Sequence, residues 1–186
     1  MTTKIIKIHG CSGAGKTTAA RTLMANSIST QKCYNAARKV EAYKLELLTV
    51  EAPVYLLGSY ENNCGGMDTV SSAAAAMELV QKYSNVGHVV HEGLLQSTYY
   101  GAMGTDSKRY GDRYIYAFLD TPIELCLERV VARREAMGST NKFNPQLTRD
   151  KHATIERLKK RLVHMGHMVA KIYHDQPYYP QLLGLL

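Results

Sequence analysis

Short apolar runs alternate along this chain with longer segments in which apolar residues recur at helical spacing. The runs predict strands at 4–9, 40–48, 52–58, 87–93, 114–119 and 168–173. The helical segments are 16–26, 69–83, 120–137 and 148–165. Residues 35–48 also fit a helix, so the pattern leaves both structures open there. Strands alternating with helices predict one domain over 1–186, an α/β three-layer sandwich with a central parallel sheet flanked by helices.

Polar segments separate these elements. Residues 27–37 are polar and irregular, 59–68 form a polar loop, and the glycine-containing segment 94–112 is rich in loops. Ligands of parallel sheets bind at the carboxyl ends of the strands. We therefore expect four polar groups to meet at that edge, namely the loop after the first strand, residues 59–68, Glu92 and Asp120.

The loop after the first strand carries the most specific motif. Residues 10–17 read Gly10-Cys11-Ser12-Gly13-Ala14-Gly15-Lys16-Thr17, the complete G-x-x-x-x-G-K-[ST] phosphate-binding loop or Walker A motif. A strand precedes it and a helix follows, which is the context that the motif requires. Backbone N–H groups through Thr18 would bind the phosphates of ATP, Lys16 would reach the β- and γ-phosphates, and the Thr17 hydroxyl would bind Mg²⁺. The alternative is a glycine-rich turn before an ordinary helix.

Two carboxylates are candidates for the chemistry beside this loop. Glu92 ends an apolar strand, where an acid holds Mg²⁺ or orients the nucleophile; alternatively, it caps a turn. Asp68 is placed to accept the proton of an attacking hydroxyl, or to cap the helix that follows it, and the two roles can coexist. The adjacent Gly65 and Gly66 would let a substrate approach the backbone closely. Tyr60 is a candidate for stacking on a base, or a partly buried core tyrosine.

Positive charge concentrates in one stretch. Residues 129–161 hold ten Lys or Arg and three acids, which equals the formal charge of +7 of the whole chain. Arg129, Arg133 and Arg134 are spaced to stabilise a transferring phosphoryl group, and residues 133–150 would form a lid over the donor. The stretch as a whole fits a polyanion such as a nucleic-acid backbone, although a solvated helix face is the common alternative.

Other features narrow the class of protein. The cysteines Cys11, Cys33, Cys64 and Cys126 form no C-x-x-C pair, which favours reduced thiols and a cytoplasmic location. His88 and His91 are three residues apart on a strand, so they should face opposite sides and make a poor metal pair. No apolar run approaches the ~20 residues of a membrane span, and we expect neither a signal peptide nor a membrane partner. The oligomeric state stays open, with a homodimer as one option.

The phosphate loop, the strand-end acid, the Leu119-Asp120-Thr121-Pro122 helix start and the R-x-x-x-R-R pattern together resemble the P-loop nucleoside and nucleotide kinases. Within them, residues 56–68 and His91-Glu92-Gly93-Leu94 are similar to bacteriophage 5-hydroxymethyluridine DNA kinases, which are thymidylate kinase-like. That resemblance implies transfer of the ATP γ-phosphate to the hydroxymethyl group of a modified pyrimidine in DNA. It also implies that the base leaves the stack, to be held by Tyr60 or by tyrosines near 99–100.

Three other functions stay open. A kinase for a free nucleoside or nucleoside monophosphate needs fewer cations than this chain has. The hypothesis of a free-nucleotide kinase is also weakened by the position of Asp112-Arg113-Tyr114. These residues have the letters of the thymidylate kinase D-R-[YFH] motif, but they stand just before a strand instead of after one. A nucleotide-binding regulatory module without phosphoryl transfer is the third hypothesis. An NTPase motor is the least favoured, since the chain is short and has no recognisable oligomer-forming extension.

Overall fold

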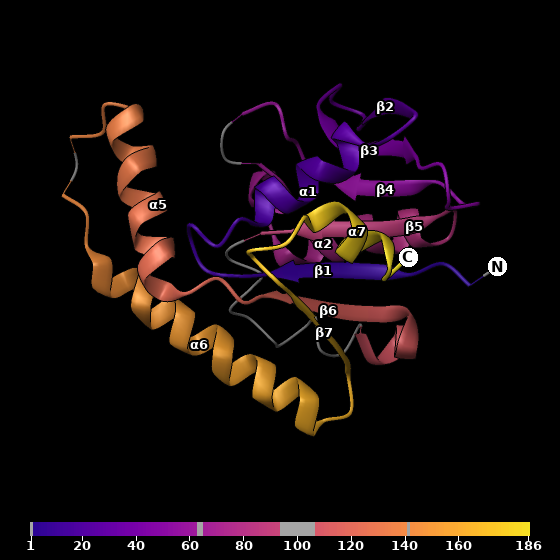
Figure 1. Cartoon of the computed structure of the whole chain (residues 1–186). Helices are drawn as coiled ribbons and strands as arrows, with labels where there is room; N and C mark the ends of the chain where they lie inside the picture. The colour runs from indigo at the N-terminus through magenta and orange to yellow at the C-terminus, as the bar shows by residue number, and fades with distance from the viewer. Residues whose placement is uncertain (1, 63–64, 94–106, 141) are drawn as a thin grey trace.

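A seven-stranded sheet forms the centre of the molecule (Figure 1). The computed structural model describes residues 2–62, 65–93, 107–140 and 142–186. The strand order across the sheet is β2-β3-β4-β5-β1-β6-β7. The strands are β1 (Ile5–His9), β2 (Ser29–Tyr34), β3 (Val40–Glu46), β4 (Val54–Leu57), β5 (His88–Glu92), β6 (Tyr114–Leu119) and β7 (Met168–Ile172). The six strands predicted from apolar runs are confirmed, and β2 is an addition.

The sheet is mostly parallel, as predicted, and its antiparallel part is a hairpin at one edge. Strands β4, β5, β1, β6 and β7 run parallel, whereas β3 is antiparallel to both β2 and β4. The prediction that residues 27–37 are irregular is wrong, and so is the helical alternative for residues 35–48. Five of the six β2 residues are exposed. This strand is therefore held by backbone pairing to β3 and has no apolar pattern to reveal it.

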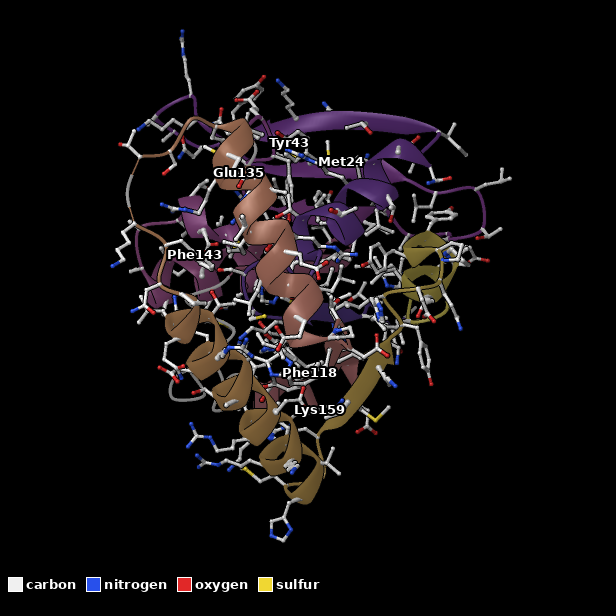
Figure 2. All side chains as sticks on the ribbon, turned by 60° about the vertical axis from the view of Figure 1, so that its left-hand side comes forward. Met24, Tyr43, Phe118, Glu135, Phe143 and Lys159 are labelled. Atoms are coloured by element: carbon white, nitrogen blue, oxygen red, sulfur yellow. The ribbon has the colours of Figure 1, made fainter. Side chains whose placement is uncertain are left out.

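Helices cover both faces of the sheet. They are α1 (Lys16–Ala25), α2 (Ala73–Ser84), α5 (Ile123–Ala136), α6 (Pro145–His164) and α7 (Tyr178–Leu183), with 3₁₀ turns η1 (Met67–Thr69) and η2 (Gly111–Arg113). On one face α1 and α7 contact each other. On the other face, Tyr83 of α2 lies 4.7 Å from the Tyr55 ring of β4, and Lys159 of α6 lies 5.9 Å from the Phe118 ring of β6 (Figure 2). The strand register places Tyr55 and Phe118 on the same face, so the three-layer sandwich is confirmed.

Capping residues set the helix boundaries. Helix α2 begins at Ala73, and its N-cap is Ser72, whose hydroxyl accepts a 3.1 Å hydrogen bond from the Ala75 amide. The prediction that Asp68 caps this helix is therefore wrong, because Asp68 lies in the separate turn η1. Helix α6 begins at Pro145, three residues earlier than predicted, because Asn144 accepts a hydrogen bond from the Gln146 amide and proline suits the first helical position.

The described residues contain neither a membrane-spanning helix nor a disulfide. No helix among these residues is long and apolar enough to cross a membrane. The three cysteines that the structure describes, Cys11, Cys33 and Cys126, are free thiols, and Cys64 lies outside the described residues. His88 accepts a hydrogen bond from the Lys4 amide, whereas the His91 imidazole lies 3.2 Å from the Tyr114 hydroxyl. The two histidines thus have different hydrogen-bond partners.

A buried lysine gives the folded state a predictable pH dependence. Lys7 in β1 is 1% exposed, and burial lowers its pKa from 10.5 to about 7. Between these values the unfolded chain holds a proton that the folded protein has lost, so the free energy of unfolding should rise with pH by about 1 kcal/mol per unit. Below pH 7 both states are protonated and this dependence vanishes. Urea unfolding from pH 7 to 9.5 should show a smaller rise in Lys7→Met than in the wild type, the remainder coming from Lys16, whose pKa burial also lowers; parallel curves would contradict the role of Lys7.

Candidate active site

A cavity of about 620 Å³ lies at the carboxyl ends of the central strands and collects most of the predicted site residues. The predicted residues that line it are Ser12, Gly13, Gly15, Lys16, Thr17, Thr18, Gly65, Asp68, Glu92, Arg129 and Arg133. They come from the loop after β1, the start of α1, the loop after β4, the end of β5 and helix α5. Segments far apart in the chain thus meet at one edge of the sheet, as expected for parallel strands.

Lys16 is buried at the base of this cavity. Its ammonium donates hydrogen bonds to the carbonyl oxygens of Gly10, at 2.9 Å, and Cys11, at 3.1 Å. Burial lowers the pKa of Lys16, and the nearby carboxylates of Glu92 and Asp68 oppose that shift. The lysine is therefore a desolvated cation surrounded by negative or partly negative oxygens. Phosphate oxygens can replace these oxygens as acceptors, and in a dry site their attraction to the cation is strong.

Thr17 and Glu92 place two hydrogen-bonded oxygen atoms in the same cavity as the lysine. The Thr17 hydroxyl donates a 2.9 Å hydrogen bond to Oε1 of Glu92. Burial raises the pKa of Glu92, and Lys16 and the Thr17 hydrogen bond oppose that shift. The described residues contain no group of three or more His, Cys, Asp or Glu arranged to hold a metal. Mg²⁺ is commonly held by one or two protein oxygens together with phosphates and water, so the Thr17–Glu92 pair fits it.

The loop between β4 and α2 supplies the opposite side of the cavity. Arg21 of α1 donates hydrogen bonds to the carbonyl oxygens of Tyr60, at 3.1 Å, and Asn62, at 2.6 Å, and Gly66 is bridged to Ser59. These contacts hold the loop that carries Asp68 against the cavity, which Asp68 lines. Asp68 also lies close enough to Lys16 and Glu92 to affect both pKa values.

Gly65 and Gly66 make this loop compact. A Cβ on Gly65 would lie 2.6 Å from the Ser59 carbonyl oxygen, and a Cβ on Gly66 would lie 2.6 Å from Oε1 of Glu92. Gly66 also has φ 73° and ψ −149°, a conformation that is nearly restricted to glycine. Both glycines therefore have a packing role, besides the substrate approach predicted for them.

Replacing Gly66 by alanine should lower the free energy of unfolding by about 3 kcal/mol and displace the Glu92 carboxylate, since backbone strain and a steric clash add. Gly138→Ala is the matched control, because Gly138 also has a positive φ of 61° but no atom within 4 Å of the added Cβ. Strain alone should cost that variant ~1 kcal/mol. Urea unfolding compares the two variants. Equal losses would mean that the contact between Gly66 and Glu92 is unimportant.

Tyr60 lies in the core instead of on the cavity surface. Its side chain is 6% exposed, its ring meets the Tyr43 ring edge-on at 6.0 Å, and burial raises the pKa of its hydroxyl. The ring therefore has no free face on which a base could stack in this structure. Of the two interpretations of Tyr60, the buried core tyrosine is the one that the structure supports. The tyrosines at 99 and 100, also considered as base contacts, lie outside the described residues.

The three arginines of α5 differ in position. Arg129 donates a 3.4 Å hydrogen bond to the Gly13 carbonyl oxygen and lines the cavity together with Arg133. Arg134 does not line this cavity, and its guanidinium lies 5.8 Å from the ring of Phe143. The predicted lid, 133–150, comprises the end of α5, the connection to α6 and the first turns of α6.

Three cavity residues are absent from the sequence prediction: Arg21, His174 and Tyr178. Asp120, the fourth predicted polar group, does not line the cavity. Its Oδ1 accepts hydrogen bonds from the His174 backbone amide and imidazole, at 2.8 and 3.0 Å. Burial alone would raise the pKa of Asp120, but these bonds and Lys171 outweigh burial and lower it. Asp120 thus acts through His174, which follows the end of β7 and could have been found by the strand-end rule. Tyr178 belongs to α7, where no motif marks it.

Comparison with known proteins agrees with this geometry. The family model of the 5-hmdU DNA kinases matches residues 2–172. A 5-hmdU DNA kinase of Pseudomonas phage M6 is 34% identical over 182 residues, covering 92% of both chains. Another, of Pseudomonas phage PaMx11, is 36% identical over 157 residues, covering 80% of this chain and 79% of the relative. A match over nearly the whole chain shows that this protein belongs to the 5-hmdU DNA kinase family.

Proposed function

We propose that this kinase transfers the γ-phosphate of ATP to the hydroxymethyl group of 5-hydroxymethyluracil in DNA. The observation that carries the proposal is that one cavity is lined by Lys16, the Thr17–Glu92 pair and Asp68, so groups suited to a phosphate donor and to a proton acceptor share one site. The printed names of the two phage relatives support the same acceptor. The reaction would take place in the cytoplasm of the host cell, where ATP and phage DNA are both present.

The protein's own groups account for the binding of the donor. The amides of residues 13–18 would surround the phosphates, and the Lys16 ammonium would exchange its carbonyl partners for β- and γ-phosphate oxygens. Thr17 and Glu92 would hold Mg²⁺, which when bound neutralises charge on the phosphates and orients them. Arg129 and Arg133 would place positive charge beside the transferring phosphoryl group, and Arg134 would join them only after rotation of its side chain.

Asp68 would act as the general base. Its carboxylate accepts the proton of the acceptor hydroxyl while the hydroxyl oxygen forms a bond to the γ-phosphorus. The bond between that phosphorus and the β–γ bridging oxygen breaks, and ADP leaves with the bridging oxygen. Asp68 belongs to the loop after β4, so the modified base would enter from that side after leaving the stack.

Transfer from γ-labelled ATP tests the proposal. With Mg²⁺ present, label should enter duplex DNA that contains 5-hydroxymethyluracil and should not enter the same duplex with thymine. A panel of free nucleosides and monophosphates is assayed in parallel. Label only in a free nucleotide would overturn the DNA-kinase proposal and leave a small-molecule kinase. Label in no acceptor would favour a nucleotide-binding module without phosphoryl transfer.

A further inference from the structure

A second cavity, of about 980 Å³, lies beside the candidate active site and takes no part in the function proposed above. The tip of the β2–β3 hairpin forms one wall and α2 forms the other. Its floor contains Gly58, Ser59 and Thr69, which belong to the same loop as Asp68. This loop therefore separates two cavities, with the phosphate loop on one side and the hairpin on the other.

We propose that this groove and the hairpin tip bind the DNA strand next to the nucleotide being phosphorylated. The inference rests on the proposed function, because it assumes that the acceptor is part of a DNA strand. It assigns the strand to a surface different from the basic stretch 129–161 that the sequence singles out. The hairpin lies next to the acceptor loop, its tip has exposed aromatic and cationic side chains, and hydrogen bonds and an ion pair connect it to that loop.

Position separates the two candidate surfaces. The hairpin continues the sheet beyond β4, and the loop that carries Asp68 follows β4 directly. Helix α6, which holds much of the basic stretch, packs on β7 at the opposite edge of the sheet. Figure 1 shows β2 and α6 at opposite ends of the molecule. A strand whose base enters beside Asp68 must therefore pass the hairpin, whereas α6 lies on the side of β6 and β7.

The hairpin tip has the chemistry of a nucleic-acid contact. Tyr34 is 57% exposed, and an exposed tyrosine ring is a surface on which any base can stack. Arg38 and Lys39 make no ion pair among the described residues, and Arg38 is held at φ 57° in the turn. These side chains contribute little to the core, so recognition explains their presence better than stability does.

Acids in the groove are mostly neutralised. Glu41 is paired with Lys82, and Glu61 is paired with Lys32 at 2.6 Å. Glu78 on α2 is the lining acid that makes no ion pair among the described residues. The free positive charge therefore lies at the hairpin tip and the free negative charge lies on the opposite wall. A strand bound here would have its phosphates on the hairpin side.

The hairpin is connected to the acceptor loop by three contacts. Lys32 pairs with Glu61, the Tyr43 hydroxyl accepts a 3.2 Å hydrogen bond from the Tyr60 amide, and the Gly58 amide donates a 2.8 Å hydrogen bond to the Glu41 carbonyl oxygen. Because all three partners lie in residues 58–61, DNA held on the hairpin is fixed relative to Asp68. This connection gives the hairpin a way to position the acceptor, besides binding it.

Fluorescence anisotropy with a labelled duplex containing 5-hydroxymethyluracil tests the inference over a series of salt concentrations. The double variant Arg38→Ala/Lys39→Ala should reduce the slope of log K against log salt by about 1.4 to 1.8, since each phosphate contact contributes about 0.7 to 0.9. Tyr34→Ala should weaken binding about tenfold with little change in slope. The matched control is Arg157→Ala/Lys160→Ala, which removes the same two residue types from exposed positions of α6.

The outcomes separate the inference from the function on which it rests. Loss of DNA affinity in the hairpin variants, with unchanged ATP affinity and unchanged binding in the α6 control, would support the groove. An equal or larger loss in the α6 control, or wild-type DNA binding by both hairpin variants, would overturn it. If the wild type phosphorylates the modified duplex in either case, the proposed function stands and only the docking surface changes. If it does not, the function itself fails.

Discussion

Asp68→Asn is expected to lower kcat for phosphorylation of the modified DNA by about 10²- to 10⁴-fold, while the affinity for ATP stays within about twofold. The amide keeps the shape of the carboxylate but cannot accept the acceptor's proton. Since Ser72 and not Asp68 caps α2, the substitution removes no helix cap. The measurement is steady-state transfer from γ-labelled ATP, with ATP binding followed separately by a fluorescent analogue.

Asp112→Asn is the matched control for this result. It makes the same chemical change at an exposed residue of η2, outside the cavity. Glu92 is the competing base, because its carboxylate lines the same cavity. If Asp68→Asn kept the wild-type kcat, or only raised KM for DNA, Asp68 would have a positioning role. Glu92 would then be the candidate for the general base.

Lys16→Met is expected to reduce kcat/KM for ATP by about 10³-fold and to leave the protein at least as stable as the wild type. The loss follows from removing the cation that would contact the β- and γ-phosphates. The stability follows from the lowered pKa of Lys16, which means that the folded state holds this charge at a cost. Methionine has a similar length and needs no hydrogen-bond partner.

Thermal unfolding and kinetics on the same preparations check both parts of that prediction. Lys160→Met, at an exposed position of α6, is the control for a change of one charge. If Lys16→Met were both inactive and unfolded, the loss of activity could come from either cause. Lys16→Arg, which keeps the positive charge, is therefore measured beside it. Wild-type transfer in a folded Lys16→Met protein would contradict the role of the lysine and, with it, the phosphate loop as the donor site.

The central strands could be predicted from the sequence because parallel strands are buried on both faces. All residues of β1, β5 and β6 are buried; β6 is a continuous apolar run, and β1 and β5 each contain consecutive isoleucines or valines. The β2 strand could not be predicted in this way, because it is held by pairing to β3 and lies in solvent. A hairpin of this kind depends on backbone hydrogen bonds, which any residue except proline can form.

The residues of the candidate site likewise differ in whether the sequence alone could predict them. The phosphate loop and Glu92 are local features: a motif of consecutive residues and an acid that ends an apolar strand. Their meeting follows from strand order alone. Tyr178 comes from the far end of the chain and reaches the cavity only through the packing of α7, whereas His174 follows the end of β7 and falls under the strand-end rule. Tyr60 is a candidate from the sequence but lies in the core. Nothing in its sequence context distinguishes a core tyrosine from a surface one.

The outer edge of β2 bears on how copies of this protein can associate. A free strand edge invites pairing with another strand, and natural proteins prevent it with a lysine or an irregular register. Here β2 carries Lys32, and its register with β3 shifts between Cys33 and Tyr34. These two features disfavour the joining of two sheets through β2. We therefore expect any self-association to use a surface other than the β2 edge.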